Sequence, residues 1–332
     1  MSTTATPTGG KAAFDTRAFV KQYAIVGILV IFVVILAAVT GGKFMQPQNL
    51  LNVVTQVAAI GIIAIGMTFV IITLGIDLSV GSILALSAVV ATSFTQIPAD
   101  NAKYPNMAFA IIVPILAGLG VGLAAGFVNG WLISTFAIAP FIATLGMMSS
   151  ARGLALIYSD GRPISRLDPG FNFIGQGNIF GIPFPIILFA LVAVGAHIVL
   201  NFTRFGRHVY AIGGNEQAAR VSGINLKRST LVIYSMVGAL AGLAGIISAA
   251  RIGSGNPQLG TGIELDAITA AVIGGTSFKG GIGTIWGTVI GALIIQSLNT
   301  GLVLLGMSDF VQMVVKGAII IVAVILDERK NR

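Results

Sequence analysis

The sequence predicts an all-α polytopic membrane protein with about ten transmembrane helices, both termini in the cytoplasm and an inverted internal repeat. Hydrophobic residues make up 55% of the 332 residues and charged residues only 9%, a composition outside the range of soluble globular domains. Aliphatic runs of about 20 residues, the length that crosses a bilayer as a helix, recur along the chain. The lack of cysteine excludes disulfides, thiolate metal sites and a cysteine nucleophile.

The chain is expected to begin and end with short cytoplasmic segments. Residues 1–22 are polar and basic, and we expect the first span after them to be retained and not cleaved as a signal peptide. A transmembrane domain is expected over residues 23–326, with a cytoplasmic loop over 202–228 and a cytoplasmic tail over 327–332. The ten expected spans cover residues 23–40, 51–74, 80–95, 107–135, 137–158, 183–201, 229–249, 266–277, 282–305 and 308–326.

Lysines and arginines orient these spans. With a cytoplasmic N-terminus, twelve cations fall in inside segments and five in outside segments, and this excess supports two cytoplasmic termini. The inside cations are Lys11, Arg17, Lys21, Arg204, Arg207, Arg220, Lys227, Arg228, Lys279, Arg329, Lys330 and Arg332, and the outside ones are Lys43, Lys103, Arg162, Arg166 and Arg251. The net charge of +8 then faces the anionic inner leaflet of the lipid bilayer and requires no nucleic-acid partner.

The central basic loop contains the pattern of one short helix. Asn215 is a good N-cap, Glu216 occupies the first turn, Arg220 the last turn and Gly223 the C′ position. A helix of roughly two turns is marginal alone in water. It therefore needs a surface to pack against, either the rest of this chain or a partner protein.

Glycines recur every four residues in three spans, which places them on one face of each helix. These stripes are Gly118, Gly122, Gly126 and Gly130, then Gly238 and Gly242, then Gly283, Gly287 and Gly291. Such stripes let helix backbones approach closely in lipid. They indicate either static packing or a sliding contact that acts as a gate.

A short repeat supports the inverted arrangement. Gly75-Ile76-Asp77-Leu78 precedes the third span, and Gly262-Ile263-Glu264-Leu265 precedes the eighth. An odd number of spans separates the two copies, so they should face opposite sides of the membrane, as in proteins with alternating access.

The first copy belongs to a turn motif formed by Gly75, Asp77, Ser79 and Gly81. A carboxylate inside a span is costly, so we expect Asp77 or Ser79 to accept hydrogen bonds from backbone N–H groups at the start of the third span. Gly75 and Gly81 are expected to permit the turn. The alternative is that Asp77 carries a proton or an ion.

The sequence lacks the motifs of an enzyme. It has no phosphate-binding loop, no zinc-protease helix and no nucleophile elbow, so we expect no catalytic site, metal or cofactor. Any ATP-driven transport therefore needs an ATPase on another subunit. Arg152 and Lys316 lie inside spans, where each must snorkel or face a wet cavity.

Four segments occur in order along the chain. They are Gly75-Ile76-Asp77-Leu78-Ser79-Val80-Gly81, the run from Thr203 to Ile224, Glu264-Leu265-Asp266-Ala267-Ile268, and Gly274-Gly275-Thr276-Ser277. From about residue 45 to the C-terminus, this combination resembles the permeases of bacterial ABC sugar importers of the ribose/xylose/galactoside family.

The resemblance implies a permease in the bacterial cytoplasmic membrane that dimerises with a second permease copy. It also implies docking on an ATPase subunit with nucleotide-binding domains, and delivery of a monosaccharide by an extracytoplasmic sugar-binding protein. The short cytoplasmic helix then corresponds to the family's coupling helix. The coupling residues implied are Gly214, Asn215, Glu216, Ala218, Ala219 and Gly223.

A sugar path needs small residues and neutral polar groups, because a conduit must release what it binds. By type, the candidates for it are Gln56, Thr144, Ser149 and Asn299, although each is equally suited to hydrogen bonding between helices. Arg162 and Arg166, in the outer loop 159–183, are candidates for docking the binding protein. The alternative function is an ion-coupled secondary transporter or channel for a small polar solute, for which the sequence has no cluster of carboxylates.

Overall fold

The computed structural model describes residues 16–97, 102–104, 107 and 109–330. Most of the expected N-terminal segment and the last residues of the expected tail lie outside this part. The α-helices are α1 (Thr16–Val39), α2 (Pro47–Ile72), α3 (Val80–Ser93), α4 (Ile112–Phe136), α5 (Pro140–Tyr158), α6 (Pro169–Gln176), α7 (Phe184–Phe202), α8 (Arg204–Gly214), α9 (Glu216–Val221), α10 (Leu226–Ile252), α11 (Ile263–Ile273), α12 (Ile285–Leu304) and α13 (Asp309–Lys330), with a 3-10 turn at Lys43–Met45.

Strands are short and lie in connections. β1 (Ile164–Ser165) pairs antiparallel with β4 (Ser254–Gly255), and β2 (Asn178–Ile179) pairs antiparallel with β3 (Ile182–Pro183). The all-α membrane architecture predicted from the sequence is therefore confirmed. The expected domain boundaries stay a prediction.

Every expected span corresponds to one helix. Within the described residues, six helices are long and apolar enough to cross a membrane alone, namely α2, α4, α5, α7, α10 and α12. By contrast, α3 has 14 residues and α11 has 11, so at about 1.5 Å per residue each falls short of a hydrocarbon core of roughly 30 Å. An irregular segment precedes α3, and a series of turns precedes α11. The number of ten spans stays a prediction.

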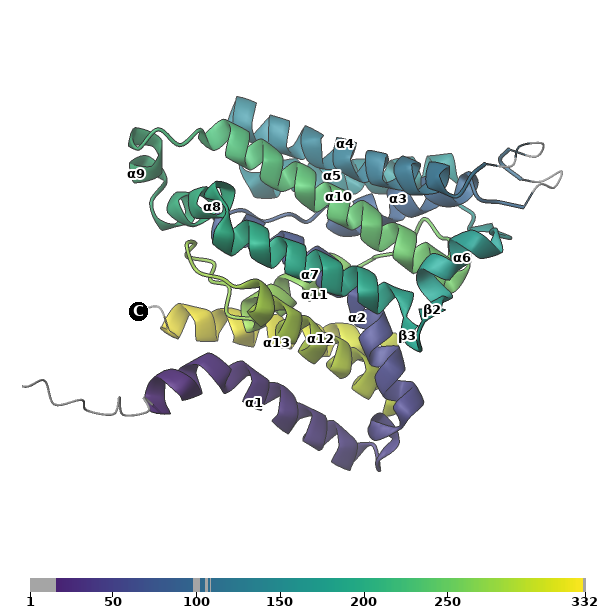
Figure 1. Cartoon of the computed structure of the whole chain (residues 1–332), viewed down its shortest axis with the longest axis horizontal. Coiled ribbons are helices and arrows are strands. Elements are labelled where there is room, and N and C mark those ends of the chain that lie inside the picture. Colours follow the sequence, from purple (N-terminus) through teal and green to yellow (C-terminus); the bar gives the residue numbers. More distant parts are fainter. Residues whose placement is uncertain (1–15, 98–101, 105–106, 108, 331–332) are drawn as a thin grey trace, which may run out of the picture.

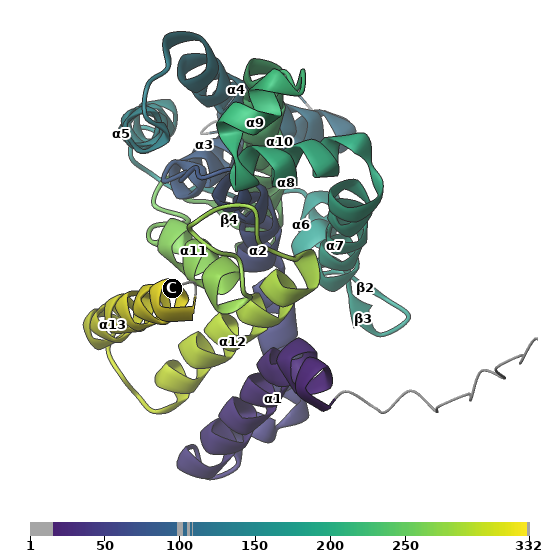
Figure 2. The same cartoon turned by 90° about the vertical axis from the view of Figure 1, so that its left-hand side faces the viewer.

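The long helices lie side by side, as Figure 1 shows. The start of α1, the end of α13 and the helices α8 and α9 lie at one end of the bundle, whereas α6 and the β2–β3 hairpin lie at the other. Helix α2 runs through the middle, where it packs against α7, α10, α11 and α12, and from Val57 to Ile72 it is almost entirely buried (Figure 2).

Two of the glycine stripes meet each other. Gly122 in α4 lies so close to Gly238 and Gly242 in α10 that an added Cβ would press on the Gly238 carbonyl oxygen and lie 3.0 Å from the Gly242 Cα. In α12, Gly291 lies in the same way against the Ala270 carbonyl of α11. The stripes therefore act as surfaces for close backbone packing, as lipid-embedded helices require.

The two short helices begin next to each other. Gly81, in the first turn of α3, lies against the Gly260 carbonyl and the Glu264 carboxylate at the start of α11. Both copies of the short repeat thus lie at the start of a half-length helix. The inverted repeat stays a prediction.

Candidate functional site

Helix α9 is capped at both ends as the sequence predicts. The Asn215 side chain accepts a hydrogen bond from the Ala218 N–H at 2.9 Å. At the other end Gly223 adopts φ +82°, and the Ile224 and Gly223 N–H groups donate to the carbonyls of Ala219 and Arg220, each at 3.1 Å. These two hydrogen bonds form a Schellman motif, which satisfies carbonyl groups at the C-terminal end of this helix of 6 residues.

One predicted coupling residue faces inward. Ala219 is only 4% exposed, because the helical period turns it toward this chain, whereas Ala218 lies on the outer side. In this conformation a partner cannot touch the Ala219 side chain directly. Val221, which sequence reasoning missed, is 87% exposed. An apolar side chain this exposed on a polar helix is typical of an interaction site.

Helix α8 joins α9 to the end of α2. Gly213 packs directly against the Ile72 carbonyl, and Gly281 donates its N–H to that same oxygen at 2.9 Å. The Tyr210 hydroxyl donates to the Gly283 carbonyl at 2.7 Å. Helix α8, which precedes α9, therefore contacts both the end of α2 and the loop before α12.

The Asp77 turn differs in detail from the expectation. Asp77 accepts hydrogen bonds from the Ser79 N–H at 2.8 Å and from the Ser79 hydroxyl at 2.5 Å, but the helical residues of α3 receive no side-chain cap. Asn129 in α4 donates to the Ser79 hydroxyl at 2.9 Å. The Asp77 carboxylate thus fixes the residue before α3 and, through it, links α3 to α4.

The glycines of this turn serve close packing. Gly75 and Gly81 do not adopt positive φ, and Leu74 takes the left-handed conformation at φ +63° instead. A Cβ at Gly75 would lie 2.6 Å from the Tyr234 hydroxyl. The expectation that these glycines permit the turn by their backbone freedom is therefore wrong, since they leave room for α10 and α11.

Several polar side chains within the bundle bond to one another. Gln56 accepts from the Gln296 amide at 3.2 Å, so this candidate path residue joins α2 to α12. Asn299 donates to the Asp266 carboxylate at 3.3 Å, and Lys316 forms an ion pair with the same oxygen at 2.9 Å. Lys316 therefore finds a buried partner on α11, a pairing that sequence reasoning missed.

Arg152 is held by a loop. Its guanidinium donates to the carbonyls of Pro257 at 2.5 Å and Leu259 at 2.9 Å, which precede α11. These bonds satisfy a partly buried charge without exposing it to lipid. They also connect α5 to the segment that enters α11.

The two path candidates on α5 lie in different surroundings. Thr144 is fully buried, and its hydroxyl donates to carbonyls of its own helix and to Ile76 at 3.3 Å. Ser149 is exposed, as are the neighbouring Ser150 and Gly146 on the same outer face. Of the two candidates, Ser149 is therefore the one with an exposed side chain.

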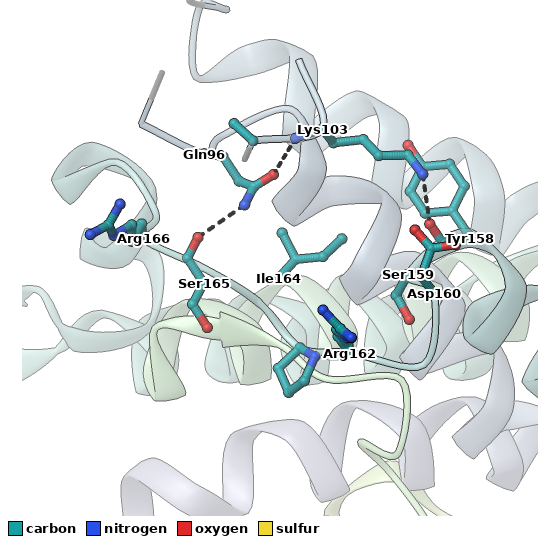
Figure 3. A pocket seen from close by; sticks show the side chains of 11 residues that line it. Gln96, Lys103, Tyr158, Ser159, Asp160, Arg162, Ile164, Ser165 and Arg166 are labelled. Carbon is teal, nitrogen blue, oxygen red and sulfur yellow. Dashed lines mark hydrogen bonds between the residues drawn. The ribbon is translucent and has the colours of Figure 1, made fainter. Parts of the chain in front are cut away.

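A cavity at the end of the bundle opposite α8 and α9 contains the predicted docking arginines (Figure 3). It has a volume of about 680 Å³ and is lined by Arg162, Arg166 and Lys103, with Asp160 beside them. Lys103 donates to the Tyr158 carbonyl at 2.9 Å, whereas no ion pair joins either arginine to another residue in the described part of the chain. The cavity therefore presents two cations that are available to an acidic partner.

Known proteins match most of the length of this chain. A family model described as branched-chain amino acid transport system / permease component matches residues 49–324. The ribose import permease protein RbsC of Bacillus subtilis (strain 168) is 47% identical over 300 residues, which cover 90% of each protein. RbsC of Escherichia coli (strain K12) is 41% identical over 326 residues, 97% of this chain and 98% of that protein. The galactose/methyl galactoside import permease protein MglC of the same strain is 40% identical, over 96% of this chain and 98% of its own. No solved structure matches.

Proposed function

The chain belongs to this family of transport permeases, and we propose that it forms the path by which a monosaccharide enters the cell in an ATP-binding-cassette importer. It is a multi-pass subunit of the bacterial cytoplasmic membrane. Relatives whose names specify ribose and galactose cover almost the whole chain, which supports a monosaccharide as the cargo. The observation that carries the mechanism is the doubly capped helix α9, whose exposed apolar residue is Val221.

We infer that α9 docks on an ATPase subunit that supplies the energy. Val221 projects from its outer side and offers an apolar contact, while α8 connects the helix to α2. Replacing Val221 by serine removes that contact but leaves the buried Ala219 in place. Because burial of a valine contributes about 1.5 kcal/mol or more, docking should weaken roughly tenfold or more.

The experiment measures binding of the purified ATPase subunit to the permease and sugar uptake in proteoliposomes. Val221→Ile serves as the matched control, because it keeps an apolar side chain at the same place. We expect Val221→Ser to lower both signals and Val221→Ile to keep them. Normal docking of Val221→Ser would exclude this side of α9 as the contact.

A second copy of the permease is proposed to cover the outer face of α5. Helix α5 lies at the edge of the bundle in Figure 2, and Ser149, Ser150 and Gly146 are exposed on it. Hydroxyls and small residues on a lipid-exposed face favour association with another helix. Two such faces would form a conduit of weak hydroxyl contacts between the copies, with Gln56 and Asn299 as further candidates deeper in the bundle.

On the outer side, the cavity with Arg162 and Arg166 is proposed to receive acidic groups of the sugar-binding protein. Charge reversal at the two arginines should weaken the stimulation of ATPase activity by that protein, and added salt should weaken the wild-type stimulation in the same direction. Ser149→Phe should instead block uptake and spare the stimulation. Identical behaviour of both variants would contradict the separation of docking surface and conduit.

A further inference from the structure

A second cavity lies at the opposite end of the bundle, beside the coupling helix. Its volume is about 530 Å³, within the range of small-molecule sites, and its walls come from α9, the α4–α5 connection, the segment before Gly75 and the first turns of α10. The proposed docking of α9 on an ATPase subunit does not use this cavity. Its lining combines two cations, several hydroxyls and an apolar floor.

The cations lie on the walls formed by α9 and α10. Arg220 is exposed and forms a long ion pair of 3.4 Å with Glu216, a contact that a stronger anion can replace. Lys227 is also exposed and has no ion pair with any other residue that the structure describes. Arg220, Lys227 and Glu216 together carry a net positive charge.

Hydroxyl groups line the same cavity. Ser134, near the end of α4, and Thr230, in the second turn of α10, both line it and are partly exposed. Tyr234 also lines the cavity, but its hydroxyl is buried beside Gly75 and is not accessible from the cavity. The accessible Ser134 and Thr230 hydroxyls can exchange hydrogen bonds with the hydroxyls of a ligand.

We propose that this cavity binds the phosphate ester of a polyol. The phosphate lies between Lys227 and Arg220, because doubly charge-assisted hydrogen bonds favour an oxyanion there. The polyol hydroxyls then reach Thr230 and Ser134. Bound in this way, the ligand contacts both α9 and α10 and so restricts the movement of the coupling helix.

Two sources can supply this chemistry, a glycerol phosphate headgroup of the inner leaflet or a soluble sugar phosphate. Trp131 and Phe136, exposed near the end of α4, pack edge to face with ring centroids 5.0 Å apart. Aromatic side chains of this kind gather at the membrane interface. The cavity therefore lies at the level of lipid headgroups, which makes phosphatidylglycerol the first ligand to test.

The test measures binding directly on the purified full-length permease, without the ATPase subunit or the binding protein. The chain has two tryptophans, so a Trp286→Phe background leaves Trp131 as a fluorescent reporter next to the cavity. Short-chain phosphatidylglycerol, glycerol 3-phosphate and short-chain phosphatidylcholine are titrated separately. We expect saturable binding of phosphatidylglycerol or glycerol 3-phosphate, and none of phosphatidylcholine. Phosphatidylglycerol alone would identify the lipid as the source, and glycerol 3-phosphate would identify a soluble one.

Variants distinguish binding in this cavity from nonspecific attraction of anions to a basic surface. Lys227→Gln should weaken binding about tenfold, and Thr230→Val, which replaces only the hydroxyl by a methyl group, should weaken it severalfold. Arg228→Gln is the matched control, since Arg228 is the adjacent exposed cation but does not line the cavity. The proposal is overturned if neither phosphate ester saturates, or if Lys227→Gln and Arg228→Gln change the affinity equally. Because the readout needs no partner subunit, this result is independent of whether α9 docks on an ATPase.

Discussion

Because α4 packs closely on α10, we predict that one methyl group added at their contact destabilises the protein. An alanine at Gly122 would place its Cβ against the Gly238 carbonyl and 3.0 Å from the Gly242 Cα. Both are backbone atoms, so they cannot rotate away and the helices must separate. Overpacking of this kind costs about 1–3 kcal/mol. Gly120, on the same helix, has no atom within 4 Å of an added Cβ, so Gly120→Ala should be neutral or stabilising by up to about 1 kcal/mol.

The assay heats each detergent-purified variant and measures the fraction that still elutes as intact protein in size-exclusion chromatography. At roughly 2–4 °C per kcal/mol, Gly122→Ala should lose several degrees of thermal stability while Gly120→Ala loses none. Gly238→Ala should resemble Gly122→Ala, because its Cβ would meet the same contact from the other side. The double variant Gly122→Ala/Gly238→Ala should lose less thermal stability than the two single variants added together, because helices already separated by one methyl group have room for the second.

Equal stability of Gly120→Ala and Gly122→Ala would refute the reasoning, because the two differ only in what the new methyl meets. Uptake also tests whether the contact slides. If α4 and α10 form a static pair, uptake by Gly122→Ala follows the folded fraction. If they move against each other, uptake falls even where the protein remains folded.

Three further changes test the coupling helix, the Asp77 turn and the buried ion pair. Gly223→Pro should abolish uptake but leave membrane insertion intact, because proline cannot adopt φ +82°, whereas Gly223→Asn, which tolerates that conformation, should keep most uptake. Asp77→Asn should retain uptake per amount of protein, while Asp77→Leu leaves the Ser79 N–H unpaired at about 1–3 kcal/mol; equal loss in both would instead indicate that Asp77 carries a proton or an ion. Lys316→Met should lower the free energy of unfolding by about 3 kcal/mol, because it leaves the buried Asp266 carboxylate without its cation. Adding Asp266→Asn should restore most of that loss, and an unchanged stability of Lys316→Met would show that the pair has no role in stability.

The helical architecture could be predicted because each span carries its own signal. Apolar length and the glycine period are local properties, so the ten expected ranges each contain a helix and the stripes of α4 and α10 do pack together. The caps of α9 are local as well, and Asn215 and Gly223 have the predicted conformations. Local chemistry is therefore sufficient where a few neighbouring residues determine the outcome.

Side-chain facing could not be predicted, because it depends on tertiary contacts. By type Thr144 and Ser149 are similar, yet one bonds within its own helix and the other is exposed. From its charge we expected Lys316 to snorkel or to face a wet cavity, but its pairing with Asp266 follows from how α13 lies on α11. Val221 was missed because a single apolar residue in a polar loop is unremarkable until its exposure is known.

The contacts around Ile72 explain how a short helix at the surface can influence the interior. Gly213 of α8 lies on the Ile72 carbonyl, the last residue of α2, and the chain continues from there into the Asp77 turn that begins α3. Both partners are backbone, so the contact has little compliance and transmits displacement rather than absorbing it. A push on α9 should therefore alter the position of Asp77 before it alters the far end of the bundle, where α6 and the β2–β3 hairpin lie.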